Sequence, residues 1–509
     1  MKKIILALCL VFCTFCSAYA ERVWINNLRS NFLNKSSIMM EINPRTFNAS
    51  DVDGDGLINV KDGDEKGTFL SAIARLDAMR TYGIDTLVVM PITQVGKIKA
   101  LGTAGSLYAT ADFTKINPQL VNEKAGLSDI EQAKKFVKEA HNRGLNVIVD
   151  LPAFGAYDLF LRRPELFAKN SNGEMITPAN WTDVLMLDAG TEENYNKDVF
   201  EMYKGFVDLV QEIEFDGVRA CSPSTKTAKF WQDLITYSRK YDQQFLWIAQ
   251  TNDSANITNA PVKTSTEKLL LAGFDGTYGN IVDIRNSMNA KELNSNLSEL
   301  FNYVKKHQNK DAIVGAFATH DDLSTMLAKG YPYTIMLYWL NAVLPVNSYV
   351  LDGNQSGDGY VYGYGNKRAP KSDTDDDQYF VNRGKIDIFN YSRRPGGANQ
   401  VLMNEYVMSN QFKRYFSSHL NNGEYKLLKT TNADIFAFGV TYNHTTIVVM
   451  GNINYNSFAK GEVKLPKISN EKITIPVKIS DAPLIEKGKV EVNLTPGEIQ
   501  ILLVNDYEL

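Results

Sequence analysis

The sequence predicts a (β/α)8 barrel of the α/β class followed by an antiparallel β-sandwich. From about residue 37 to residue 351, short apolar runs alternate with amphipathic helical patterns. This alternation indicates a parallel sheet whose strands are joined by helices, and a count of about eight strands favours a closed barrel. From about Asn422, β-rich runs follow one another without helical patterns between them. Periodicity alone leaves a doubly wound open sheet as the alternative to the barrel.

The first 20 residues have the pattern of a secretory signal peptide. Lys2 and Lys3 precede an apolar run, and Ala18 and Ala20 are the small residues expected before a cleavage site. The run is too short to favour a membrane span, so we expect cleavage after Ala20 and a secreted or periplasmic protein. An uncleaved anchor is the alternative, although the polar pair 21–22 follows the run directly. No later segment is apolar for long enough to suggest a membrane span.

The barrel elements are expected within residues 21–421. The predicted strands are 37–42, 85–90, 146–151, 215–220, 245–249, 312–318 and 347–351. The predicted helices are 67–82, 128–143, 195–213 and 227–240. The first of these helices is amphipathic, because Phe69, Ile73, Leu76 and Met79 recur at helical spacing.

The C-terminal domain is expected over residues 422–509. Its predicted strands are 435–442, 445–453, 461–465, 473–479, 489–494 and 499–504. Gly, Pro and Asn lie between them, a pattern typical of a small antiparallel sandwich.

Charge and cysteine content exclude some functions. The formal net charge is −4 and there is no basic cluster, so nothing suggests a nucleic-acid partner. Three of the four cysteines lie in the signal peptide, which leaves Cys221 alone in the mature chain. No internal disulfide is therefore expected.

An acidic loop near the N-terminus has the donor spacing of a calcium site. Its expected ligands are Asp51, Asp53, Asp55, the carbonyl of Leu57, Asn59 and Asp62. Alternating oxygen donors suit a hard cation that takes six to eight oxygens, and Gly56 permits the sharp bend. The loop differs from an EF-hand by having Asp62 in place of glutamate at its last position. A solvated turn is the alternative, and the acidic cluster 373–377 is a second candidate for a cation.

Several segments resemble the alpha-amylase superfamily, glycoside hydrolase family 13. They are 40–47 (MEINPRTF), 87–92 (LVVMPI), 108–113 (YATADF) and 181–188 (WTDVLMLD). The resemblance covers nearly the whole mature chain and implies a small inserted loop domain at about 151–192, after the third strand. It also implies that the ring of Tyr108 stacks under a bound sugar. The acidic loop resembles the calcium loop that some members carry after their first strand.

Part of the chemistry of this family is kept at the matching positions. Asp150 matches the aspartate of the Asp-x-x-x-Asn-His motif, and Arg219 matches the arginine of Gly-x-Arg-x-Asp. His320 and Asp321 match the last two residues of Asn-His-Asp. The resemblance implies that Asp321 stabilises the transition state, and that Asp150, Arg219 and His320 line the substrate site.

The two carboxylates that would carry out hydrolysis are replaced. Cys221 occupies the position of the nucleophile and Gln250 that of the general acid. Phe154 and Gly155 stand where the first motif has Asn and His. A retaining glycosidase needs one carboxylate to attack the anomeric carbon and a second to protonate the leaving oxygen. Gln250 has no titratable proton, and a Cys221 thiolate would still lack an acid for the leaving group.

Each of these residues also has a purely structural interpretation. Cys221 is also explained as a small buried residue at a strand end, and Gln250 as a structural hydrogen-bonding group. Asp321 could persist only to neutralise Arg219, because an unpaired buried guanidinium is costly. His320 could be a core histidine, and Tyr108 an ordinary packing aromatic.

Three functions follow from this combination. The leading hypothesis is an exported, calcium-stabilised, catalytically impaired protein of carbohydrate metabolism that binds an α-glucan or a related saccharide. The second is a divergent active glycosidase or glycosyltransferase that uses Asp253 or Asp322 as its carboxylate. The third is an interaction scaffold with a vestigial cleft. An open, aromatic-lined cleft favours binding, a filled one favours the scaffold, and a new carboxylate pair near Cys221 favours the enzyme. The pattern leaves the oligomeric state open.

Overall fold

The structure is a computed structural model. It describes residues 27–52, 58, 60–100, 105–178, 181–252, 257–308, 310–358, 399–465, 473–478 and 485–505. The predicted signal peptide and the acidic cluster 373–377 lie outside these residues.

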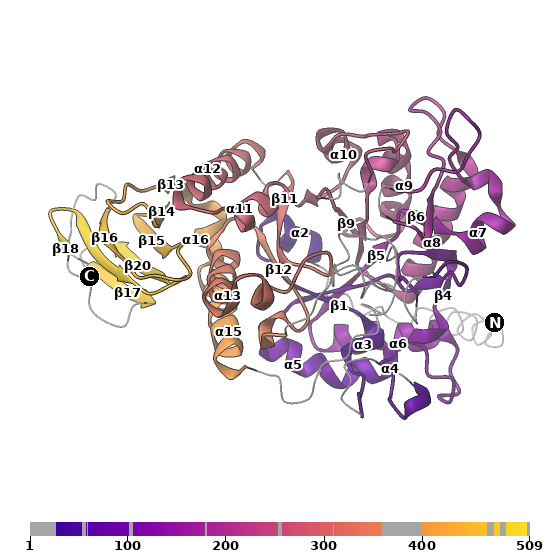
Figure 1. Ribbon diagram of the computed structural model, residues 1–509, viewed down its shortest axis with the longest axis horizontal. Helices are drawn as coiled ribbons and strands as arrows, with labels where there is room; N and C mark the ends of the chain where they lie inside the picture. Colours follow the sequence, from indigo (N-terminus) through magenta and orange to yellow (C-terminus); the bar gives the residue numbers. More distant parts are fainter. Residues whose placement is uncertain are drawn as a thin grey trace, which may run out of the picture.

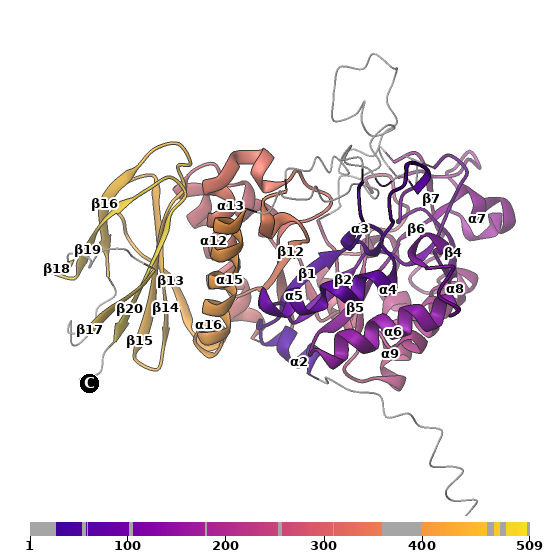
Figure 2. The same cartoon turned by 90° about the horizontal axis from the view of Figure 1, so that it is seen from below.

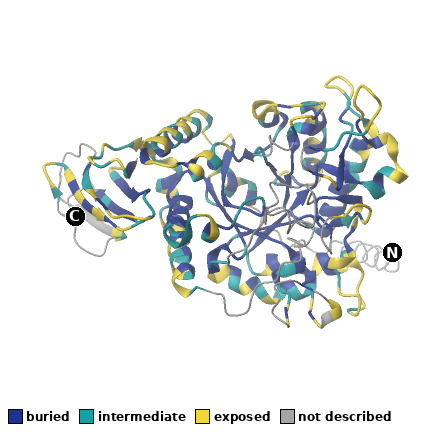
Figure 3. Ribbon diagram, in the orientation of Figure 1, coloured by how far each residue is buried: buried dark blue, intermediate teal, exposed yellow. Residues whose placement is uncertain are grey.

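Eight parallel strands close into a barrel, in the order β1-β12-β11-β10-β9-β8-β5-β2 (Figure 1). The strands are β1 (Ile38–Ile42), β2 (Thr86–Val89), β5 (Asn146–Leu151), β8 (Gly217–Ala220), β9 (Leu246–Ala249), β10 (Gly276–Thr277), β11 (Ala312–Ala318) and β12 (Asn347–Leu351). Every strand residue is buried, as expected for a sheet covered on both faces (Figure 3). The barrel predicted from the sequence is therefore confirmed. The strand absent from the predicted set is β10, whose two residues are too few to give a periodic pattern.

Helices surround the barrel and also separate it from the C-terminal domain. They are α2 (Leu28–Leu33), α3 (Pro44–Phe47), α4 (Phe69–Ala72), α5 (Leu76–Thr81), α6 (Asp129–Asn142), α7 (Tyr157–Arg162), α8 (Lys197–Ile213), α9 (Ala228–Tyr241), α10 (Thr266–Ala272), α11 (Ile281–Asn286), α12 (Ala290–His307), α13 (Thr325–Val343), α15 (Gln400–Tyr415) and α16 (Ser417–Asn422). Local capping sets several starts; Ser128 and Glu131, for example, form a reciprocal capping box at α6.

The helix predicted over 67–82 is divided. A 3-10 turn, Ile73–Arg75, separates α4 from α5. Arg75 stands at this junction, where its guanidinium donates to the carbonyl of Phe47 and pairs with Asp352 at 2.8 Å.

A small four-stranded sheet lies beside the barrel, in the order β3-β4-β6-β7. Its strands are β3 (Thr93–Val95), β4 (Thr110–Ile116), β6 (Phe154–Ala156) and β7 (Val184–Met186). Two of these strands lie in the region predicted as an insert, and the other two come from the connection after β2. The insert is thus anchored to an earlier loop of the barrel.

The C-terminal domain consists of a five-stranded sheet facing a three-stranded sheet. The larger sheet contains β13 (Glu424–Leu427), β14 (Ile435–Tyr442), β15 (Thr445–Asn452), β20 (Ile499–Asn505) and β17 (Ile473–Lys478). The smaller contains β16 (Ala459–Lys464), β19 (Lys489–Leu494) and β18 (Ile485–Glu486). All pairings are antiparallel, which confirms the predicted sandwich.

The barrel and the sandwich share one hydrophobic core. Phe301 of α12 and Leu340 of α13 belong to the same buried cluster as Phe438 of β14 and Ile501 of β20. Helices α12, α13, α15 and α16 form the layer between the two domains (Figure 2). Among the described residues, no helix is both long and apolar enough to cross a membrane.

Candidate active site at the mouth of the barrel

The barrel interior changes from apolar to charged toward the carboxyl ends of its strands. Met39 and Ile148 belong to the apolar interior cluster, whereas the next inward positions on the same strands are Glu41 and Asp150. The strand register places Asp150 of β5 directly opposite Arg219 of β8. Active sites of such barrels form at this end, so the alternation within each strand positions the charged layer there.

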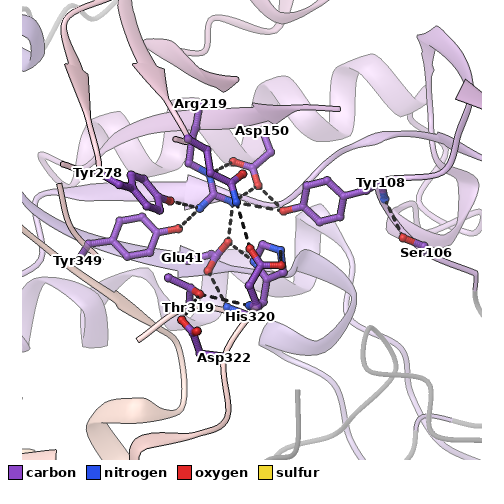
Figure 4. A network of polar contacts seen from close by, with 12 residues as sticks. Glu41, Ser106, Tyr108, Asp150, Arg219, Tyr278, Thr319, His320, Asp322 and Tyr349 are labelled. Atoms are coloured by element: carbon purple, nitrogen blue, oxygen red, sulfur yellow. Dashed lines mark hydrogen bonds and ion pairs between the residues drawn. The ribbon is translucent and has the colours of Figure 1, made fainter. Parts of the chain in front are cut away.

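Arg219 is the centre of a buried polar network (Figure 4). Its Nε donates to Asp150 Oδ1 at 2.7 Å, and its Nη2 donates to Glu41 Oε1 at 2.9 Å and to Asp150 Oδ2. Its Nη1 donates to the hydroxyls of Tyr278 at 2.7 Å and Tyr349 at 2.6 Å. The Arg219 side chain is 1% exposed and both carboxylates are 0% exposed, so every charge in the network is desolvated and paired.

His320 joins the network through Glu41. Its Nδ1 lies 2.6 Å from Glu41 Oε1, so Glu41 is shared between His320 and Arg219. Burial disfavours the imidazolium, but the charges of Glu41 and Asp321 outweigh burial and raise the pKa of His320. Burial likewise opposes the charge of Glu41, yet His320 and Arg219 hold the pKa of that carboxyl below its usual value. Both pKa directions favour the ion pair between His320 and Glu41.

Asp321 does not neutralise Arg219, and that interpretation of its presence is wrong. The carboxylate partners of Arg219 are Glu41 and Asp150. Asp321 instead accepts a hydrogen bond from Gln250 Nε2 at 3.0 Å and lies 3.6 Å from His320 Nε2. Gln250 thus contacts Asp321 directly.

Cys221 lies in apolar surroundings at the end of β8. It is 7% exposed and belongs to a buried cluster with Tyr108, Phe154 and Trp181. The rings of Phe154 and Trp181 meet edge to face, with centroids 5.2 Å apart. Phe154 of β6 therefore contributes an aromatic side chain to the apolar surroundings of Cys221.

Tyr108 is engaged within the protein. Its hydroxyl donates to Asp150 at 2.5 Å, and its ring stacks on the His320 ring with centroids 5.0 Å apart. Only 3% of Tyr108 is exposed, and Gln250 is 7% exposed. The residues expected to contact a sugar are thus gathered at the barrel mouth, as the motifs predict, but they are buried.

The sequence interpretation missed Glu41, Tyr278 and Tyr349 as members of this network. A signal existed for Glu41, because it is the single charged residue in the buried strand Ile38–Ile42. Of the spare carboxylates, Asp322 accepts from Thr319 Oγ1 at 2.7 Å and pairs with Arg285. Asp253 lies outside the described residues.

The ends of the predicted calcium loop are brought together. Ser50 and Glu65 form an antiparallel bridge, and Asp64 Oδ1 accepts from the Val52 amide at 2.7 Å. Asp51 is buried within this closure. Residues 53–57 and 59, which contribute most of the expected ligands, lie outside the described residues. Among the residues that are described, no group of three or more His, Cys, Asp or Glu side chains could hold a metal ion.

Solved alpha-amylase structures share the fold of this chain. The maltogenic alpha-amylase AmyB from Thermotoga neapolitana superposes with a TM-score of 0.67 at 20% identity, over 94% of this chain and all of that one. The alpha-amylase of Geobacillus thermoleovorans, solved with acarbose, superposes with a TM-score of 0.68 at 16% identity, over 94% and 99% of the two chains. The chain therefore has the alpha-amylase fold.

Curated proteins match over shorter segments. Isoamylase SU1 from Zea mays is 24% identical over 142 residues, which are 26% of this chain and 17% of that protein. The alpha-1,4-glucan:maltose-1-phosphate maltosyltransferase of Mycobacterium tuberculosis is 25% identical over 246 residues, 45% of this chain and 32% of that protein. The matches thus span less than a third of the length of these relatives. No protein-family model matches the chain.

Proposed function

We propose that the protein is an exported, catalytically impaired member of the alpha-amylase superfamily that binds an α-glucan. One observation carries the loss of catalysis: Gln250, at the general-acid position, donates its amide hydrogen to Asp321. An amide cannot protonate a leaving oxygen, and the nearby thiol of Cys221 is not the carboxylate that a retaining mechanism uses. Calcium held by Asp51, Asp53, Asp55, the Leu57 carbonyl, Asn59 and Asp62 is part of the proposal as a structural ion.

The choice of an α-glucan is supported by the similar proteins. The maltosyltransferase is named for a reaction of an alpha-1,4-glucan, and the Geobacillus alpha-amylase was solved with acarbose. The signal-peptide pattern at residues 1–20 supports export. Both observations agree with an α-glucan ligand that the protein binds outside the cytoplasm.

The first test is an assay of the purified mature protein with soluble starch, maltooligosaccharides and an activated aryl α-glucoside. We expect no turnover above background. The activated substrate needs little help from an acid, so it is the most sensitive probe of a nucleophile. Turnover that disappears in Cys221→Ala would contradict the proposal, because it would make the thiol a working nucleophile.

The second test restores the missing carboxylates. Cys221→Asp with Gln250→Glu is expected to recover slow α-glucosidase activity, since the paired carboxylates are the minimum for the reaction. Each single variant should recover far less, because groups that act as a unit are not additive. Recovery should be incomplete, since Phe154 and Trp181 keep the surroundings of residue 221 apolar. A folded double variant without activity would mean that these positions do not face a sugar-shaped space.

A non-glycan scaffold is the second candidate, and the burial of the barrel mouth favours it. Tyr108, Gln250 and His320 are all less than a tenth exposed. Calorimetry with maltoheptaose separates the two functions. Heat of binding by the wild-type protein supports the glucan-binding proposal, whereas no binding to any α-glucan would leave the scaffold as the better account.

A further inference from the structure

A pocket of about 480 Å³ lies at the junction of barrel and sandwich, away from the network of Arg219. One wall is α13, which is interrupted at Gly330 (φ 78°, ψ −162°), two residues before Pro332. The sandwich packs closely on this interruption, since a Cβ on Gly497 would lie 2.5 Å from the Pro332 carbonyl oxygen. The opposite wall is the turn that follows β15. The pocket is therefore built by a helix break that the second domain holds in place.

The turn that forms the second wall is fixed by its own side chains. Asn454 Oδ1 accepts from the amides of Asn456 at 3.0 Å and Ser457 at 3.1 Å. Its Nδ2 donates to Asp434 Oδ2 at 3.2 Å. Asn452 adds a hydrogen bond from Nδ2 to the Ser457 carbonyl at 2.8 Å. Because these bonds order the loop, little conformational entropy remains to be lost when a ligand binds.

An aromatic residue and a cation line the same pocket. Tyr455 is half-buried, and its ring meets that of Tyr333 edge to face at 5.2 Å. Lys329 Nζ lies 5.4 Å from the centroid of the Tyr455 ring and 5.1 Å from that of Tyr333. Among the described carboxylates, none lies within ion-pair distance of Lys329, so its ammonium has donor capacity left for a ligand.

The lining groups match a neutral ligand that is rich in hydroxyls. Asn456 is exposed and offers both a donor and an acceptor, Asp434 offers acceptors and Lys329 offers donors. The charges of Lys329 and Asp434 cancel, so the pocket has no net charge with which to select an ion. Tyr455 and the exposed Met288 supply apolar surface. Small-molecule sites commonly combine apolar surface with a few polar groups, and they favour domain interfaces.

We propose that this junction pocket is a saccharide subsite that holds a short segment of an α-glucan chain. The inference rests on the proposed glucan-binding function and locates the binding outside the buried barrel mouth. Hydroxyls of the sugar contact Asn456, Asp434 and Lys329, and the apolar face of a pyranose ring packs beside Tyr455.

The test is calorimetric titration of the full mature protein with maltoheptaose. Tyr455→Ala removes the aromatic surface, and Ala328→Trp fills the pocket from the exposed side of α13 without removing any packing. Each is expected to weaken binding at least tenfold. Tyr415→Ala is the matched control, because Tyr415 is 83% exposed on α15 and does not line the pocket; its affinity should equal that of the wild type. Gln250→Trp is the corresponding block at the barrel mouth.

The outcomes separate the inference from the proposed function. Loss of affinity in Ala328→Trp with retention in Gln250→Trp supports the junction subsite, even if Tyr455→Ala does not fold. Loss in Gln250→Trp with unchanged affinity in both junction variants would overturn the subsite and leave glucan binding intact. No binding by the wild-type protein would overturn both.

Discussion

The side chain of Arg219 shows how a single residue can organise a barrel interior. Its guanidinium contacts two carboxylates and three tyrosine hydroxyls in the described interior, and it is almost fully buried. Replacing a buried ionic group with apolar residues is often neutral, but removing one partner leaves a desolvated charge and is strongly destabilising. Removal of the Glu41 charge should destabilise the fold most, because Glu41 pairs with both Arg219 and His320.

We predict that Glu41→Gln lowers the free energy of unfolding by about 3–5 kcal/mol, since it removes one charge from a buried, paired group. Urea denaturation followed by circular dichroism measures the change. Glu424→Gln is the control: Glu424 is exposed and lies 4.0 Å from Lys305, so the substitution should change stability by less than about 0.5 kcal/mol. A loss of less than about 1 kcal/mol in Glu41→Gln would mean that the ionised carboxylate of Glu41 contributes little to the stability of the fold.

The same network predicts how stability depends on pH. Burial opposes the charge of His320, but Glu41 and Asp321 raise its pKa above the value in the unfolded chain. The stabilisation is fully present below the unfolded pKa of His320, and it is lost as pH rises through the folded pKa. The free energy of unfolding of the wild type should therefore fall as pH rises from the unfolded to the folded pKa of His320. The fall should be smaller in Glu41→Gln, which lacks one of the charges that raise this pKa. Denaturation curves across the neutral range test this; an equal fall in both proteins would contradict it.

At the scale of elements, α15 is tied to the barrel by a buried lysine. Lys413 donates to the carbonyl of Val346 at 2.7 Å and to that of Asn341 at 3.2 Å. Burial lowers the pKa of Lys413 to about 7. The unfolded chain binds this proton up to a much higher pH, so the contribution of Lys413 to stability rises between pH 7 and the unfolded pKa.

We predict that Lys413→Met removes a stability increase of about 1.4 kcal/mol per pH unit above pH 7, the value for one differentially bound proton. Equilibrium denaturation of the wild type and the variant from about pH 7 to pH 9 gives the difference. Lys305→Met, at a position that is 77% exposed, should leave the slope unchanged. Parallel wild-type and Lys413→Met profiles would show that Lys413 stays protonated in the folded protein.

The acidic loop is the second element with a direct test. Calcium should raise the melting temperature, because an ion that binds only the folded state stabilises it by mass action. Asp53→Ala together with Asp55→Ala should abolish the calcium-dependent shift in a thermal melt. Persistence of the shift would place the ion elsewhere, with the cluster at 373–377 as the next candidate.

Elements with strong periodicity were predictable from the sequence, and elements defined by tertiary contacts were not. Seven barrel strands and the sandwich strands β14 and β15 were expected because each is mainly a run of buried residues, and β19 because buried and exposed residues alternate along it. Strand β10 was missed, because Gly276 and Thr277 form a strand only through pairing with β9 and β11. In the site, motif matching predicted Cys221 and Gln250 as site positions, but the partners of Arg219 depend on strand register. Glu41 lies 178 positions away from Arg219 in the chain.

At the scale of the molecule, the shared core predicts one cooperative unfolding unit. Phe438 of β14 lies 5.5 Å, centroid to centroid, from Phe301 of α12. Lys478 of β17 adds a polar link, since it pairs with Glu405 of α15 at 2.9 Å. The sandwich therefore stabilises the barrel through α12, α13 and α15.

We predict a single calorimetric transition for the mature protein. Phe438→Ala should lower that transition, with a loss of about 3–5 kcal/mol, because it opens a cavity in the shared core. Phe458→Ala is the matched control in the same domain; Phe458 is 69% exposed, so the effect should stay within about 0.5 kcal/mol. Two separate transitions, with only one of them shifted by Phe438→Ala, would show that the domains unfold independently.

The Arg219 network also constrains the order in which this chain can reach its native state. Glu41 is on the first barrel strand, Arg219 is on a middle one, and Tyr349 is on the last. A chain emerging from the ribosome has Glu41, Asp150 and Arg219 long before His320 and Tyr349 are made. Until then the buried group carries one carboxylate more than its cations balance, and Arg219 lacks an acceptor. His320, which follows β11, supplies the second partner of Glu41, and Tyr349 of the last strand then completes the hydrogen bonds of Arg219. The complete hydrogen-bond network of Arg219 can therefore form only after nearly the whole barrel has been synthesised.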